Sequence, residues 1–209
     1  SHAETQALGR EVGDAVADAA LAVRTDPDAP VRADAVRVPL AARRPDEAGR
    51  RDALAALGLA PDAQVGTAEL FRLEQERTAA LPEAARREAR ARVRRHLRDR
   101  TARRFAFGER VEVEAQVLCL GPARLLALPL EPTVEVGLDW KARAGTPHAA
   151  VLGIANGWMR YLPHARDYAA PDAHHAYEVL QATFGPEAAE RLLAAGEGLL
   201  RRLEREAAA

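Results

Sequence analysis

The sequence is poor in several residues that often mark a function. Cysteine occurs once, as Cys119, so a disulfide within the chain is excluded. Its apolar neighbours predict a small buried side chain. Lysine also occurs once, as Lys141, and the net charge is −1, so no overall field favours nucleic acid or an anionic lipid surface. No apolar run approaches the roughly 18 residues of a transmembrane helix, and we find no signal peptide.

The chain does contain enough apolar residues for one sizeable core, since 48% of its 209 residues are hydrophobic. Nearly all of the positive charge is arginine, and alanine is abundant. This composition is typical of GC-rich genes, so neither count informs on function. The chain starts at Ser1 without an initiator methionine and enters a helix-like pattern directly. We expect a fragment or processed product that forms a large part of one domain.

The first half of the chain has helical periodicity interrupted by one strand. Residues 4–23 carry a single apolar helical stripe. Residues 33–41 alternate as a strand, in which Pro39 indicates the edge of a sheet or the end of a strand. Residues 46–104 are typical of two or three helices, the last of them strongly charged. We interpret residues 46–104 as a helical insertion in a larger catalytic domain.

The pattern changes to strands at residue 110. Residues 110–121 alternate before becoming fully apolar, and residues 124–130 are continuously apolar. We expect these two segments to form a hairpin whose second strand is buried on both faces. An irregular aromatic loop then reaches about residue 178, and residues 186–206 close the chain as an amphipathic helix.

A strand–helix–strand unit lies between the hairpin and this loop. Residues 132–143 predict a helix with Val134 and Leu138 along one side, and residues 149–155 predict a buried strand. The helix would join residues 149–155 in parallel to residues 124–130. Both strands then end at one edge of the sheet, where open α/β sheets bind ligands. The expected fold class is a layered α/β fold with a mixed β-sheet flanked by helices.

Polar and aromatic residues follow both of these strands. Glu131 comes directly after the first, and Asn156, Trp158 and Tyr161 come after the second. The predicted topology brings Glu131 and Tyr161 toward each other. Together with Tyr168, the aromatic residues of the loop would line a pocket. Two structural interpretations stay open: Glu131 as a favourable charge at a helix N-terminus, and Tyr161 as a hydrogen-bonding residue at the edge of the core.

Three blocks, in the order PLEPTVEVGL, AVLGIANGWMRYLP and AYEVLQATFGPEAAERLL, resemble the end of the catalytic domain of neutral/alkaline ceramidases. The resemblance covers residues 125–203. In that family two His, one Glu and one Tyr hold a zinc ion, and the matching motifs place the Glu on Glu131 and the Tyr on Tyr161. The resemblance implies hydrolysis of an N-acyl, lipid-like amide by zinc-activated water. The two His and the catalytic serine would lie in an N-terminal half that is missing here.

The chain departs from the family pattern close to these residues. The Gly of Pro-Gly-Glu is Leu130, the Gly before the Tyr is Arg160, and the Thr after Tyr-x-Pro is His164. Two Gly before Tyr-Glu are replaced by His174, His175 and Ala176. These changes leave the substrate undecided, ceramide included. Alone, the chain would supply at most half a zinc site and little activity.

An arginine-rich stretch at residues 86–104 allows a nucleic-acid interpretation. One helical face would carry Arg86, Arg87, Arg90, Arg94 and Arg98. Arginine is enriched along the whole chain, however, and no aromatic residues are interleaved for base stacking. A solvated or salt-bridged helix face is favoured, and we expect no nucleic-acid partner.

Two further alternatives concern histidines and docking. His164, His174 and His175 could replace missing ligands, but their spacing matches no standard zinc pattern.

The helices within residues 46–104 and 186–206 could instead dock on another subunit or on the missing half, as a non-catalytic interaction module. The catalytic residues, the oligomeric state and the compartment are left open by the sequence.

Overall fold

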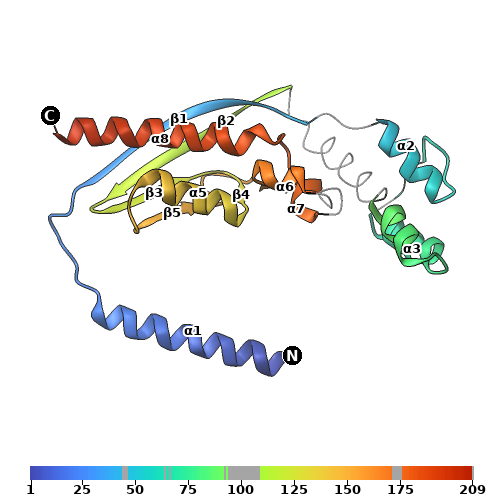
Figure 1. Ribbon diagram of the computed structural model, residues 1–209, viewed down its shortest axis with the longest axis horizontal. Coiled ribbons are helices and arrows are strands. Elements are labelled where there is room, and N and C mark those ends of the chain that lie inside the picture. Colours follow the sequence, from blue (N-terminus) through green and yellow to red (C-terminus); the bar gives the residue numbers. More distant parts are fainter. Residues whose placement is uncertain are drawn as a thin grey trace. The chain divides into compact units, whose positions relative to one another are not determined.

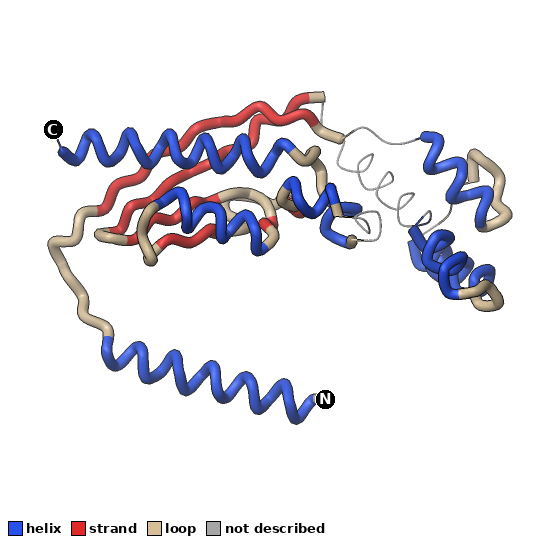
Figure 2. The backbone as a smooth tube through the Cα atoms, in the orientation of Figure 1, coloured by secondary structure: helices blue, strands red, loops and turns tan. Residues whose placement is uncertain are grey.

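The chain folds into two compact units, Ser1–Pro30 and Val31–Ala209. Figures 1 and 2 show their helices and strands. The computed structural model describes residues 1–43, 47–63, 65, 67–91, 93, 109–170 and 176–208. The predicted residues Arg94, Arg98, His174 and His175 lie outside the described residues.

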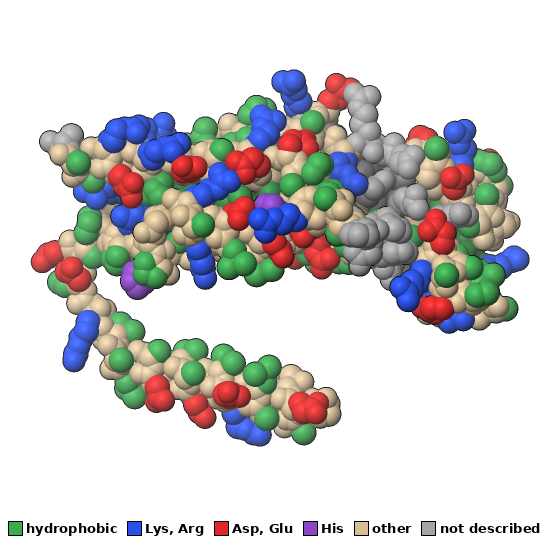
Figure 3. Space-filling view, viewed as in Figure 1, with side chains coloured by type: hydrophobic (Ala, Val, Ile, Leu, Met, Phe, Trp, Pro, Cys, Tyr) green, Lys and Arg blue, Asp and Glu red, His purple; other side chains and the backbone are tan. Residues whose placement is uncertain are grey.

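The first unit consists of the helix α1 (His2–Ala22) and the segment that follows it. The helix starts with a capping box, in which the Ser1 hydroxyl accepts a hydrogen bond from the Glu4 N–H. All of α1 is described, and none of its side chains is buried. Along the predicted apolar stripe, Leu8, Val12 and Val16 are all more than half exposed, and Figure 3 shows hydrophobic side chains along the helix.

A four-stranded mixed sheet organises the second unit (Figure 2). Its order is β1 (Val31–Ala41), β2 (Arg110–Leu120), β3 (Ala123–Ala127) and β5 (Ala149–Leu152). The first three strands are antiparallel, whereas β3 and β5 are parallel. Pro39 indeed lies in an edge strand, where a missing N–H is tolerated. The predicted hairpin, parallel crossover and layered α/β fold with a mixed sheet are confirmed.

Two helices, α5 (Val134–Ala144) and α8 (Glu187–Ala208), cover one face of this sheet (Figure 1). Alternate residues of β2 form that face, and four of them are buried: Val113, Ala115, Val117 and Cys119. The prediction that Cys119 is a small buried side chain is therefore confirmed. From α8, Leu192, Leu193, Leu199 and Leu200 complete the core.

The side of α5 that carries Val134 and Leu138 does not face the core. Val134 and Leu138 are 68% and 58% exposed, whereas Val136 and Trp140 are fully buried. Each pair is spaced i, i+4 and so forms its own stripe on the helix. The structure buries the stripe that carries Trp140, because the indole N–H can donate to the backbone carbonyl oxygen of Arg124 at 3.1 Å.

The strands of the crossover are shorter than the apolar runs. The β3 ladder stops at Ala127, and the chain resumes after Pro129 as a two-residue strand, β4 (Glu131–Pro132). The aromatic segment is also more regular than expected. It contains β6 (Tyr161–Leu162), α6 (Ala165–Ala169) and α7 (Tyr177–Gln181).

A helical segment precedes β2. It comprises α2 (Glu47–Ala56), α3 (Thr67–Thr78) and a helix over residues 83–91. Arginines of the last helix contact acceptors in the same segment. Arg90 pairs with the buried Glu74 at 2.9 Å, Arg87 pairs with Glu83 at 3.3 Å, and Arg86 donates to two backbone carbonyl oxygens. These contacts favour a salt-bridged helix face. Within the described ranges, no helix is both long and apolar enough to cross a bilayer.

Candidate functional site

The two-stranded sheet β4–β6 places the two predicted zinc ligands side by side. The strands are parallel, and Glu131 is the register partner of Tyr161. The Glu131 N–H donates to the carbonyl oxygen of Arg160 at 2.8 Å, and the Thr133 N–H donates to that of Leu162 at 3.1 Å. Register partners of adjacent strands point to the same face of a sheet, so the structure brings the Glu131 and Tyr161 side chains together.

The phenol of Tyr161 lies in a partly buried, negatively charged environment. Glu131, its register partner on the neighbouring strand, supplies the negative charge. Burial raises the pKa of the Tyr161 phenol above its ordinary value, and the negative charge of Glu131 raises it further. The ring of Tyr177 meets the Tyr161 ring edge-on, with centroids 5.5 Å apart. In the absence of a cation, Tyr161 is therefore held as the neutral phenol.

Trp158 also contacts the Glu131 carboxylate. Its indole N–H donates to Glu131 Oε1 at 2.5 Å, and its side chain is 49% exposed. The sequence predicts Trp158 as a wall of the pocket. The structure adds a polar contact with the candidate ligand, while part of the indole surface remains accessible to an apolar group.

Arg160 also belongs to this site. In the sequence it stands out only as a departure from the family pattern. Its φ is +71°, a left-handed conformation that costs a residue other than glycine roughly 1–2 kcal/mol. Its guanidinium carbon lies 5.8 Å from the centroid of the Trp158 ring. Burial lowers the pKa of Arg160, while Tyr177, Tyr161 and Glu131 act in the opposite direction. The one feature of the sequence that could have identified Arg160 as part of the site is an arginine where the family pattern has glycine.

The other two predicted pocket residues make contacts with the scaffold. The side-chain amide of Asn156 donates to Glu114 Oε1 at 3.0 Å, on β2. The Tyr168 hydroxyl donates to the carbonyl oxygen of Phe184 at 2.8 Å, and the Arg43 guanidinium lies over the Tyr168 ring. A role for Asn156 and Tyr168 in binding substrate stays a prediction.

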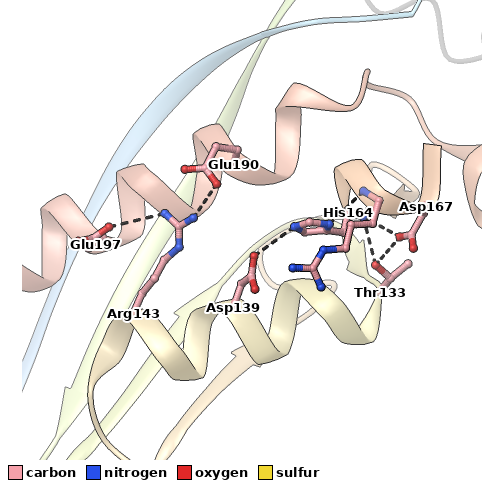
Figure 4. Close-up of polar contacts among 8 residues, drawn as sticks. Thr133, Asp139, Arg143, His164, Asp167, Glu190 and Glu197 are labelled. Carbon is pink, nitrogen blue, oxygen red and sulfur yellow. Dashed lines mark hydrogen bonds and ion pairs between the residues drawn. The ribbon is translucent and has the colours of Figure 1, made fainter. Parts of the chain in front are cut away.

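His164 links β6 to α5 and caps α6 (Figure 4). Its Nδ1 accepts from the Arg166 N–H at 3.1 Å, so Nε2 carries the proton and faces Asp139 Oδ2 at 3.1 Å. The His164 N–H donates to Asp167 at 2.7 Å, and the Thr133 hydroxyl donates to the same oxygen at 2.9 Å. His164 thus performs the helix capping that threonine favours, which accounts for the departure from Tyr-x-Pro-Thr.

The described residues supply part of a metal site. Within them, no group of three or more His, Cys, Asp or Glu side chains could hold a metal ion. Glu131 and Tyr161 are nevertheless register partners in the β4–β6 pair, and the oxygen atoms of both side chains are suitable donors to a divalent cation. The pair can supply two ligands, and a closed coordination sphere needs others.

Comparison with known proteins returned matches among solved structures. No protein-family model matches the chain, and no curated protein matches it. A ceramidase complexed with C2 is 23% identical over 47% of this chain and 15% of that chain, with a TM-score of 0.38. The neutral ceramidase from Pseudomonas aeruginosa is 19% identical over 85% of this chain and 29% of that chain, with a TM-score of 0.44. The solved structures similar to this chain thus include neutral ceramidases, and the chain spans less than a third of either of them. At these values the similarity carries no conclusion about function.

Proposed function

We propose that the chain is the C-terminal portion of a zinc-dependent amidohydrolase domain that hydrolyses the N-acyl bond of a lipid-like amide. The observation that carries the proposal is the parallel register of Glu131 with Tyr161 in the β4–β6 pair. In this proposal residues 46–104 are a helical insertion, residues 110–178 carry the crossover and the site, and residues 186–206 form the closing helix.

The donor chemistry of the pair fits zinc. Glu131 would bind through its carboxylate, and Tyr161 through its phenolic oxygen. The raised pKa of the free phenol disfavours the phenolate, and a bound divalent cation would offset this because cations favour the deprotonated form of their ligands. When bound, zinc would supply an activated water and polarise the acyl carbonyl.

The remaining residues of the site would orient Glu131 and bind the substrate. The indole N–H of Trp158 holds one oxygen of Glu131, and the exposed part of the indole offers apolar surface to an acyl chain. We assign Asn156 and Tyr168 to the walls of the same pocket. The catalytic base or nucleophile and the other two ligands would come from the rest of the domain, so we expect this chain alone to be inactive.

Zinc binding by protein that includes the region upstream of Ser1 tests the proposal directly. Zinc affinity measured by equilibrium dialysis is expected to fall at least about 10-fold in Glu131→Gln and in Tyr161→Phe, because each removes one ligand. Glu135→Gln and Tyr177→Phe are matched controls that change a neighbouring carboxylate and a neighbouring phenol. Unchanged zinc affinity in both ligand variants would rule out the assignment.

The gene sequence upstream of Ser1 offers an independent test. A His-rich block similar to Thr-His-Thr-His would supply the missing ligands that the resemblance implies. Protein that includes this region should release fatty acid from an N-acyl amide, and it should lose that activity in Glu131→Gln. An upstream region without candidate histidine ligands would contradict the proposal, because the two His ligands that the resemblance implies would have no source.

A second candidate function is a non-catalytic interaction module. The stripe on α1 favours it, because large aliphatic side chains on this helix are more than half exposed and such surfaces commonly mark contact sites. Light scattering is expected to show association that disappears on deletion of residues 1–30. A monomer at all concentrations would argue against association between copies of the chain.

A further inference from the structure

Arg160 occupies a backbone conformation that glycine would adopt at lower cost. Its φ is +71°, in the left-handed region, where a side chain crowds the backbone. Ile154, in the same segment, also has a positive φ, of +58°. The contacts of the Arg160 side chain set it apart from Ile154 and offset the backbone strain.

The Arg160 guanidinium connects α7 to the candidate ligand through Trp158. Its Nε donates to the backbone carbonyl oxygen of Gln181 at 3.0 Å, and a terminal nitrogen donates to the Gln181 side-chain oxygen. The guanidinium carbon lies within cation–π distance of the Trp158 ring, at 5.8 Å. The indole N–H in turn donates to Glu131 Oε1. The contacts therefore run from Gln181 through Arg160 and Trp158 to Glu131.

The backbone of Arg160 contacts the same residue. Its carbonyl oxygen accepts from the Glu131 N–H at 2.8 Å. Arg160 thus holds the backbone of Glu131 directly and its carboxylate through an intervening indole. A free carboxylate rotates about its side-chain bonds. The Trp158 indole, which the Arg160 guanidinium holds in place, restricts this rotation and so fixes the directions of the carboxylate lone pairs that stay available to a ligand.

We infer that Arg160 is a positioning residue that orients the Glu131 carboxylate through Trp158. The role of Glu131 as a metal ligand rests on the proposed function. The orientation of its carboxylate rests only on the contacts above. Arginine suits this position better than lysine, because its planar fork can bond both oxygens of Gln181 while it lies over the indole.

The test replaces Arg160 with glycine, which removes the guanidinium and relieves the backbone. The chain has two tryptophans, so its NMR spectrum has two indole N–H signals, and Trp158→Phe identifies the signal of Trp158. Arg160→Gly is expected to move the Trp158 signal, to leave that of Trp140 in place and to weaken zinc affinity about 10-fold. Arg160→Lys should lie between Arg160→Gly and the unmodified chain.

Ile154→Gly is the matched control, because it relieves a positive φ in the same segment and removes no polar contact. It should leave both indole signals and zinc affinity unchanged. An unchanged Trp158 signal in Arg160→Gly would overturn the inference. Zinc affinity is measured on protein that includes the region upstream of Ser1. If that protein binds no zinc, the proposed function fails, and the Trp158 signal in Glu131→Gln and Arg160→Gly still decides whether the carboxylate is oriented in this way.

Discussion

The indole N–H of Trp140 donates a hydrogen bond to the backbone carbonyl oxygen of Arg124 at 3.1 Å, which joins the middle of α5 to β3. Trp140 is fully buried. Trp140→Ala is expected to lower the free energy of unfolding by about 3–5 kcal/mol, since it opens a large cavity and removes the donor. Urea denaturation measures this change. Trp158→Phe, at a half-exposed site, should cost less than about 1 kcal/mol, and an equal loss in both variants would contradict the assigned core.

Two glycines of α8 differ in the space around them. A Cβ at Gly196 would lie 2.8 Å from Leu126 Cδ1 and 3.2 Å from Trp140 Cζ3, whereas a Cβ at Gly198 would meet nothing within 4 Å. Gly198→Ala is expected to raise the free energy of unfolding by about 1 kcal/mol through helix propensity. Gly196→Ala should instead lower it by about 1 kcal/mol, because overpacking exceeds that gain. Equal stabilisation by both variants in thermal unfolding would show that α8 is not packed so closely.

His164 stabilises the turn between β6 and α6 through its Nδ1. His164→Ala is expected to cost about 1 kcal/mol, the usual effect of losing an N-cap. His164→Thr should recover most of this loss, because a hydroxyl can accept the same hydrogen bond. Chemical denaturation compares the two, with His148→Ala at an exposed position as the control. A threonine variant as unstable as the alanine variant would indicate that the contact with Asp139 is the important one.

Cys119 is expected to make stability depend on pH. Burial raises the pKa of its thiol in the folded chain, so the unfolded chain ionises first, near pH 8.5. The associated stability is present below about pH 8.5 and is lost as the pH rises through the folded-state pKa. Cys119→Ala should show a weaker decline between about pH 8 and 10 in urea titrations. Folded chain should also resist iodoacetamide, and rapid alkylation would contradict the burial.

The order of the elements followed from local patterns. Alternation at residues 110–121, the apolar run at 124–130 and Pro39 predicted a hairpin, an inner strand and an edge strand, and the structure has all three. The crossover also predicted that Glu131 and Tyr161 would meet, because parallel strands joined by one helix end at the same edge. These features depend on side-chain periodicity and chain connectivity, and both are present in the sequence.

Tertiary structure alone decided which faces and contacts are used. On α5 two stripes of equal spacing compete, and Trp140 was buried because Arg124 offers an acceptor and Gly196 leaves room for the ring. The contact of Arg160 with Gln181 joins residues 21 positions apart in the chain, a separation that no helical or strand period predicts. Local sequence sets the conformations open to each segment, and the selection among them depends on partners that the folded chain brings from elsewhere.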